Sequence, residues 1–260
     1  MQLTIDDARN LPFLVFLLSF LVLWLAAQVG VFFRKRLRPL EEDDYDDLGT
    51  VLAAILTLLG LLIAFSFSMA ISRYDQRKNY EADEANAIGT EYVRLGLLSQ
   101  NEAARARQLL NEYLHQRIAF YEDSGLGQQL LQQVDSKTDR LEGELWSLVS
   151  NAAKNEPTPL LTLVVSGMND VLNARSYTQA AWWNRIPVAA WVLMGVMAIV
   201  CNCLIGYGAH RGRALLFIVL PLTLSISFSL VADIDSPRGG GIRVLPNNLT
   251  SLSRSIERNI

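Results

Sequence analysis

The segment LLIAFSFSMAISRYDQRKNYEADEANAIGT, residues 61–90, changes from apolar, membrane-type sequence into strongly charged amphipathic sequence. No proline or glycine interrupts it between Leu61 and Ile88, and these are the residues that most readily end or bend a helix. The segment therefore predicts one helix that leaves the bilayer and continues into water without a break.

Four apolar blocks of the chain are each long enough to cross a bilayer, which takes about 20 residues of helix. The blocks are residues 11–33, 48–71, 187–207 and 214–232. Since backbone polar groups in hydrocarbon must be satisfied inside the segment, each block is predicted to be a helix. The first block is too long for a signal peptide, and no small-residue cleavage site follows it. The sequence thus indicates an integral membrane protein with four spanning helices.

The polar region between the second and third blocks predicts a helical extramembrane domain. Apolar residues recur there at spacings of three and four, the period of an amphipathic helix. They are Leu110, Tyr113, Leu114, Ile118 and Tyr121 with Arg117 among them, then Leu131, Val134, Leu141, Leu145, Leu148 and Val149, then Leu161, Val164, Val165, Met168, Val171 and Leu172. Polar residues with Gly or Pro predict breaks at 123–127 and 155–159. No alternation of period two persists, so we expect no sheet.

These observations predict an all-α membrane protein in four parts. We expect an N-terminal transmembrane hairpin over residues 1–73 and a helical extramembrane domain over 74–182. A C-terminal transmembrane hairpin over 183–233 and a short tail over 234–260 complete the chain. The second membrane helix should be continuous with the helical domain.

The basic residues do not decide the orientation in the membrane. The short loops 34–38 and 210–213 are both basic, and the positive-inside rule would place them in the cytoplasm, with both termini and the helical domain outside. However, Arg73, Arg77 and Lys78 flank the opposite end of the second helix.

The sequence offers little support for catalysis, a metal or a cofactor. The two histidines, His115 and His210, are far apart, and no hydrolase or metalloprotease motif is present. The acidic run EEDDYDD, residues 41–47, lacks the spacing of a calcium loop and is better suited to the N-terminal end of a helix. The net charge of −3 gives no indication of a nucleic-acid partner. We therefore expect a protein that is not an enzyme.

The membrane blocks carry no Asp, Glu, Lys or Arg in their central parts. An ion-coupled transporter normally needs such a residue there, so the sequence weighs against active transport and leaves a passive pore open.

One face of the second block combines polar and large apolar residues at helical spacing, namely Thr57, Leu61, Phe65, Ser68 and Ser72. The residues alone favour ordinary packing, because serines in membrane helices bond to their own backbone or pack between helices. A pore is the alternative. Leu61 and Phe65 would then form a hydrophobic constriction, Thr57, Ser68 and Ser72 would line the pore, and Arg73 at its mouth would favour anions.

Residues 64–90, with Arg94 following, resemble the signature of a bacterial bestrophin-like family of membrane proteins, itself remotely similar to the bestrophin ion channels. The tail DSPRGGGIRV, residues 235–244, and the tripeptide Arg185–Pro187 are similar to other parts of the family pattern. The resemblance implies a pentameric homo-oligomer whose second membrane helix lines the pore, with Leu61 and Phe65 at the constriction. Arg73 and Arg77 would be the basic pair at the mouth, one residue closer together than in bestrophins. Calcium binding is not implied, because the acidic calcium site of animal bestrophins follows the fourth membrane helix, whereas the acidic run of this chain precedes the second block.

The resemblance also bears on location and contacts. It implies a helical domain in the cytoplasm, contrary to the count of basic loops. On the charged part of the second helix, Glu84, Asn86 and Arg94 are expected either to contact neighbouring subunits or to pack within their own.

From the sequence and this resemblance we expect a passive, anion-permeable ion channel in the bacterial inner membrane, whose partners are lipid, small inorganic ions and further copies of itself. The alternative is a non-conducting membrane scaffold or sensor, whose helical domain binds another protein.

Overall fold

A computed structural model describes residues 11–36, 42–122, 128–208 and 215–258. These form α2 (Pro12–Arg36), α3 (Glu42–Arg94), the 3-10 turn η1 (Leu95–Leu97), α4 (Gln100–Glu122), α5 (Gln128–Asn155), α6 (Pro159–Trp183), α7 (Val188–Tyr207), α8 (Leu216–Asp235) and α9 (Asn247–Arg258). No strand occurs in these residues, which confirms the predicted all-α class. The basic loop 210–213 and the break at 123–127 lie outside the described residues.

The second membrane helix and the start of the helical domain are one helix, as predicted. α3 contains 53 residues, and at 1.5 Å per residue it is about 80 Å long. A hydrocarbon core is about 30 Å thick, so α3 is long enough to cross it and extend well beyond. Asp44, Asp46 and Asp47 lie near its N-terminal end, where a negative charge interacts favourably with the helix dipole.

The chain divides into two compact units. The membrane unit comprises residues 1–73 and 185–243, and the helical unit comprises residues 74–184 and 244–260. α3 contributes to both. The expected tail is divided in the same way, because residues up to Arg243 belong to the membrane unit and α9 belongs to the helical unit.

Four stretches of the described chain are long and apolar enough to cross a membrane. They are residues 12–36, 44–97, 159–207 and 217–235. The third takes in α6 and α7, of which α7 is free of charged residues. The protein is therefore a multi-pass membrane protein.

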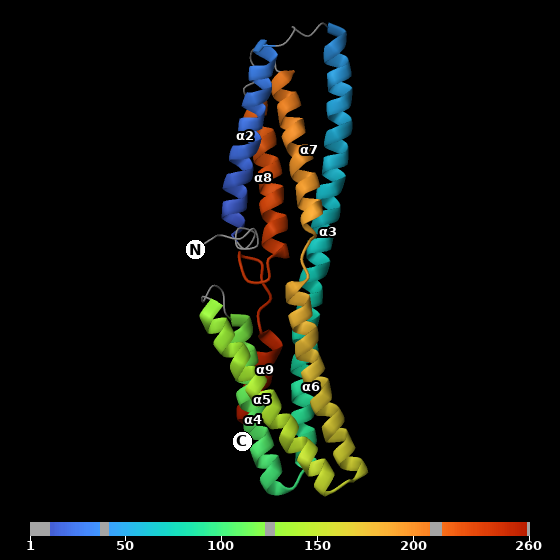
Figure 1. Cartoon of the computed structure of the whole chain (residues 1–260), viewed down its shortest axis with the longest axis vertical. Coiled ribbons are helices and arrows are strands. Elements are labelled where there is room, and N and C mark those ends of the chain that lie inside the picture. The colour runs from blue at the N-terminus through green and yellow to red at the C-terminus, as the bar shows by residue number, and fades with distance from the viewer. Residues whose placement is uncertain (1–10, 37–41, 123–127, 209–214, 259–260) are drawn as a thin grey trace. The chain divides into compact units, whose positions relative to one another are not determined.

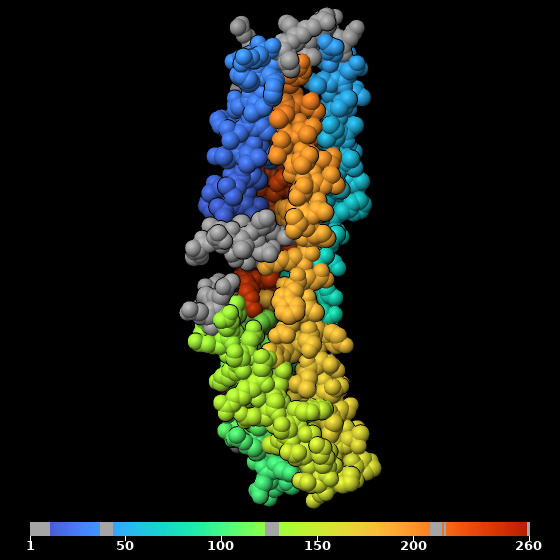
Figure 2. Space-filling model, viewed as in Figure 1, coloured from blue at the N-terminus to red at the C-terminus, as the bar shows by residue number. Residues whose placement is uncertain are grey.

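In the membrane unit, α2 packs along α7 and α8 (Figure 1). The core contains Leu23 of α2, Leu59 of α3, Met194 and Ala198 of α7, and Phe228 of α8. In the space-filling view, α8 shows only a small surface between α2 and α7 (Figure 2).

Two glycines allow α2 and α7 to approach closely. A Cβ atom at Gly30 would clash with the backbone at Cys203, and one at Gly206 would clash with the backbone at Ala27. Small residues at helix contacts are typical of membrane proteins, because close backbone approach increases van der Waals contact.

A carboxylate fixes the entry to α7. Asp235, at the end of α8 and 3% exposed, accepts hydrogen bonds from the backbone nitrogen of Ile186 at 3.0 and 3.3 Å. The glycine-rich residues that follow form a turn in which Gly240 has φ of 85°, and Asp233 accepts a hydrogen bond of 2.8 Å from the nitrogen of Gly241. These contacts link two segments, 185–187 and 235–244, that the family resemblance had singled out separately.

The helical unit is built around α3, α4, α5 and α6, and most of the periodic residues named above pack in its core. Glu81 of α3 binds the first turn of α9, accepting hydrogen bonds from the backbone nitrogens of Asn248 at 2.9 Å and Leu249 at 3.0 Å. The side chain of Asn248 also donates to Glu81 at 2.6 Å. The sequence Asn248-Leu-Thr250, which matches a glycosylation sequon, is thus the start of a helix anchored on α3.

The glycine contact yields a matched test on one helix. We expect Gly206→Ala to destabilise the protein by about 1–3 kcal/mol, because the new methyl group overpacks a backbone contact. Gly195→Ala is the control, since a Cβ there meets no atom within 4 Å, and it should stabilise α7 by about 0.5–1 kcal/mol. Thermal unfolding in detergent measures both, and equal effects of the two substitutions would contradict the close approach.

Candidate functional site

One side of α3 in the membrane unit is left uncovered by the residues that the structure describes. Leu61 is 50% exposed and Phe65 is 61% exposed, and Thr57, Ser68 and Ser72 are exposed on the same side. We call these five residues the α3 open face.

The opposite side of α3 is buried against the membrane unit. Leu59 and Ala70 are 0% exposed and Ser66 is 5% exposed. Packing within the chain therefore uses Ser66 rather than the serines of the open face. The hydroxyl of Thr57 donates to the carbonyl of Ala53 at 2.8 Å, so its hydrogen bond is satisfied without a neighbouring helix.

The two arginines predicted at the mouth of the pore differ in position. Arg73 is partly exposed, and its Nη2 lies 3.5 Å from the sulfur of Met69. Arg77 is only 2% exposed and lies about 160° around the helix from Leu61 at 100° per residue. The Arg77 side chain is therefore packed within its own chain and does not extend the open face.

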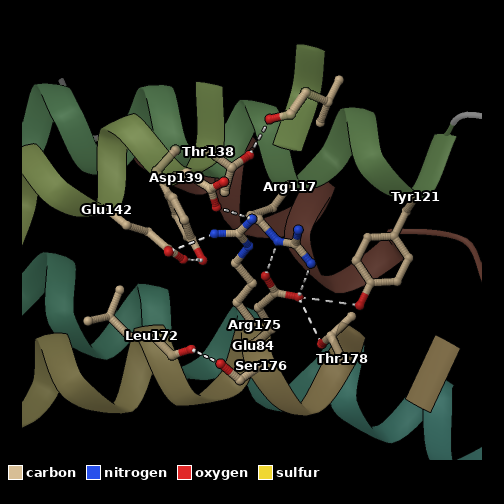
Figure 3. Close-up of polar contacts among 12 residues, drawn as sticks. Glu84, Arg117, Tyr121, Thr138, Asp139, Glu142, Leu172, Arg175, Ser176 and Thr178 are labelled. Atoms are coloured by element: carbon tan, nitrogen blue, oxygen red, sulfur yellow. Dashed lines mark hydrogen bonds and ion pairs between the residues drawn. The ribbon is translucent and has the colours of Figure 1, made fainter. Parts of the chain in front are cut away.

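Beyond Arg77, the buried side of α3 carries charged residues, and Glu84 lies at the centre of a polar network in the helical unit (Figure 3). Glu84 and Arg117 of α4 form an ion pair in which both side chains are 0% exposed. Tyr121 and Thr178 donate hydrogen bonds to the second Glu84 oxygen at 3.3 and 3.2 Å. The network thus joins α3, α4 and α6 through one carboxylate.

A second buried arginine connects α5 to α6. Arg175 lies 2.7 Å from Asp139 and 2.6 Å from Glu142, as Figure 3 shows. Tyr113 of α4 donates to Glu142 at 3.4 Å. All four long helices of the helical unit are therefore tied together by two cations and their carboxylates.

Electrostatics fix the protonation of Arg117 and Tyr121, the two groups that bind Glu84 from α4. Burial acts to lower the pKa of Arg117, but the charge of Glu84 and its hydrogen bond outweigh this and raise the pKa above its usual value. Burial, followed by the charge of Glu84, raises the pKa of Tyr121. Arg117 thus stays a cation and Tyr121 stays a neutral hydrogen-bond donor throughout the physiological pH range.

The three residues considered for subunit contacts occupy different environments. Glu84 makes its contacts within the chain, which is the alternative that the sequence left open. Arg94 lies 3.8 Å from Asp170 and is partly exposed, and Asn86 is exposed. Asn86 is therefore the most exposed of the three side chains.

Sequence reasoning placed Arg117 on the inner side of its helix but did not find its partner. The sequence does contain a signal for such a network, since charged residues recur on α3 at the same spacing as its buried apolar residues. These charged residues are Arg77, Glu81, Glu84 and Glu91. Charged residues at core spacing indicate a buried polar network, although spacing does not show which charges meet. Within the described residues, no group of three or more His, Cys, Asp or Glu side chains is arranged to hold a metal ion.

The four membrane-spanning stretches and the helical unit define a multi-pass α-helical membrane protein. Over residues 16–249 the chain matches the family model of the Bestrophin-like domain. The chain therefore belongs to the Bestrophin-like family, as its sequence resemblance predicted. No curated protein sequence matches it.

Solved structures show the same fold. A bacterial bestrophin homologue from Klebsiella pneumoniae is similar with a TM-score of 0.63 at 14% identity, over 94% of this chain and 96% of that chain. A single-substitution variant of that homologue has a TM-score of 0.61 at 13% identity, over 94% of this chain and 97% of that one. A crystal structure described as a membrane protein has a TM-score of 0.63 at 13% identity, over 94% and 96% of the two chains.

The buried ion pair can be tested by removing one partner. We expect Arg117→Met to destabilise the protein by about 3–5 kcal/mol, because Glu84 would remain buried without its cation. Chemical unfolding in detergent measures this through tryptophan fluorescence, since the Trp182 ring lies 4.8 Å from that of Phe120 next to the pair.

The control for this substitution is Arg140→Met, whose side chain is 81% exposed beside Glu144 and should contribute no more than about 1 kcal/mol. The double variant Glu84→Leu/Arg117→Met should recover part of the loss, because it leaves no unpaired buried charge. Equal effects of Arg117→Met and Arg140→Met would show that the pair contributes little.

Proposed function

We propose that the protein is a passive ion channel of the bacterial inner membrane, formed by a pentameric ring of identical chains. The α3 open face lines the pore, Leu61 and Phe65 form its constriction, and the permeant ions are anions. The family membership and the shared fold support an ion channel, and the open face is the observation that carries the assignment of the pore.

The exposure of the open face supports this role. A chain that buries Leu59 and Ala70 leaves Leu61 and Phe65 half or more exposed on the same helix. Copies of α3 arranged around a rotation axis would turn these apolar residues toward one another, and such a constriction gates ions by excluding water. A ring of this kind requires a head-to-tail interface that closes on itself.

The charges of α3 support passive transport of anions. Between Asp47 and Arg73 the helix carries no charged residue, so no group in the pore would bind an ion tightly or carry protons. Ser68 and Ser72 would line a wetter region beyond the constriction. Arg73, one residue further, would attract anions to the mouth.

A non-conducting scaffold or sensor is the second candidate. It is favoured by apolar side chains on the helical unit, where Val93 is 73% exposed and Leu160 is 57% exposed. The mass of the native assembly in detergent distinguishes the two proposals, because a channel on the α3 axis requires a closed ring, whereas a monomer or dimer favours the scaffold.

Replacing the constriction residue should change conduction. In lipid bilayers, we expect Phe65→Ala to raise the single-channel current or alter selectivity, because it removes an apolar ring from the narrowest point. Phe67→Ala is the control on the same helix, since Phe67 is turned toward the buried side and partly covered, and its current should match that of the wild type. Normal assembly without conductance under every ion and voltage tested would rule out the channel.

Charge reversal at the mouth tests the permeant ion. We expect Arg73→Glu to shift the reversal potential in a salt gradient toward that of the cation, because the ring at the mouth changes sign. Lys78→Glu is the control, as it changes the charge equally at an exposed position outside the open face. An unchanged reversal potential in Arg73→Glu would contradict anion selection by this residue.

A further inference from the structure

Three glutamates on α3 are buried in the helical unit, but their surroundings differ. Glu81 is 1% exposed, and Glu84 and Glu91 are 0% exposed. Glu81 accepts three hydrogen bonds from the start of α9, and Glu84 is held by Arg117, Tyr121 and Thr178. Both oxygens of Glu91 are buried with no hydrogen-bond partner among the described residues. Glu91 is thus the exception on a face where carboxylates are otherwise satisfied.

The space around Glu91 is shaped by a glycine of α6. A Cβ atom at Gly167 would clash with Oε2 of Glu91 and would lie 2.6 Å from Nη1 of Arg94. The carboxyl group therefore sits directly against the α6 backbone, in a position that only glycine leaves open. Any change in the size or hydration of this carboxyl group must act on the contact between α3 and α6.

Two charged groups act on Glu91, Arg94 from its own helix and Asp170 from α6. The Nη1 atom of Arg94 lies 3.8 Å from the Asp170 carboxylate, so the cation also interacts with Asp170. Arg94 makes no hydrogen bond to Glu91. From α4, Nε of Arg107 donates a hydrogen bond of 3.4 Å to the carbonyl of Tyr92. The Cζ atom of Arg107 lies 5.3 Å from the centre of the Tyr92 ring. The local cations are therefore engaged elsewhere.

A buried carboxylate without hydrogen-bond donors is costly in its ionised form and much less so when protonated. Burial raises the pKa of Glu91 from 4.5 to about 8; Arg94 opposes this effect and Asp170 adds to it. The proton is thus held at neutral pH and lost under mildly alkaline conditions.

We propose that Glu91 is a proton-binding switch: it is neutral in the packed helical unit, and loss of its proton loosens α6 from α3 at Gly167. The new charge at this position attracts water and repels Asp170, and both effects favour separation of the two helices. This inference concerns the helical unit alone and does not depend on conduction.

The first test is the pH dependence of unfolding of the full chain in detergent, compared with Glu91→Gln. Between pH 4.5 and about 8 the folded chain holds a proton that the unfolded chain has released, so wild-type stability falls as pH rises through this window. The ratio of the wild-type to the Glu91→Gln unfolding constant should rise by up to about tenfold per pH unit there and level off above it. A ratio that does not change with pH would overturn the proposal.

A direct titration follows the proton itself. In infrared difference spectra of the wild-type chain, we expect a buried carboxylic C=O band that disappears with an apparent pKa near 8 and is absent in Glu91→Gln. Asp170→Asn removes a negative neighbour and should move the transition to lower pH, whereas Asp83→Asn, at an exposed position of α3, should leave it unchanged. Loss of the band only at the pH of an ordinary carboxyl group would overturn the proposal.

Amide hydrogen exchange tests the structural consequence. For peptides containing Gly167, the ratio of the wild-type exchange rate to the Glu91→Gln exchange rate should be several-fold higher at about pH 9 than at about pH 4, where the Glu91 carboxyl group stays largely protonated even when α6 has opened. Comparison at equal pH removes the intrinsic pH dependence of exchange. An equal ratio at both pH values would show that deprotonation does not loosen α6.

Discussion

The structure depends on the continuity of α3. One unbroken helix supplies a wall of the membrane unit and the central element of the helical unit, so every contact of α3 with its own chain must fall along one stripe. Apart from Ala85, the buried residues of α3 from Leu59 to Glu91 recur at intervals of three, four or seven, which keeps them on one side of the helix. The consequence is that the opposite side of the membrane-spanning part, from Thr57 to Ser72, is not covered by the described residues.

The buried stripe of α3 consists of different residue types in the two units. In the membrane unit it is formed by Leu59, Ser66 and Ala70, and close packing is the main source of contact. In the helical unit it includes Arg77, Glu81, Glu84 and Glu91. Buried charges are poor sources of stability because desolvation offsets much of their attraction. Their geometric demands are strict, however, so the Glu84 and Arg175 networks define how α3, α4, α5 and α6 align.

The open face has a different physical meaning from an exposed apolar patch on a soluble protein. In a bilayer, exposure of Leu61 or Phe65 costs little if lipid covers the residue, so exposure alone does not identify a pore. The combination of large apolar residues with Thr57, Ser68 and Ser72 on the same face is what suits a wetted channel with a dry constriction. In the proposed channel the charge of Arg73 would act on ions at the mouth, whereas Arg77 is buried within its own chain.

Much of the architecture followed from one-dimensional patterns. Apolar block lengths predicted the spanning helices, the lack of helix breakers predicted the continuity of α3, and the periods of three and four predicted the helices of the extramembrane domain. These properties are local, because a helix satisfies its own backbone hydrogen bonds and the spacing of its apolar residues shows which face is apolar. The sequence also predicted which residues share the open face, although it did not predict that these residues would be exposed.

Pairing between distant residues was decided only by the tertiary structure. The spacing of α3 showed that Glu81, Glu84 and Glu91 share a face. It did not show that Glu81 anchors α9, that Glu84 binds Arg117, or that Glu91 meets no hydrogen-bond donor among the described residues. Such differences depend on which side chains other helices bring to each position, down to the absence of a Cβ at Gly167. The sequence by itself determined the helices and the side of each that is buried. The tertiary structure decided which charges are neutralised, because that depends on distances between atoms that are far apart in the chain.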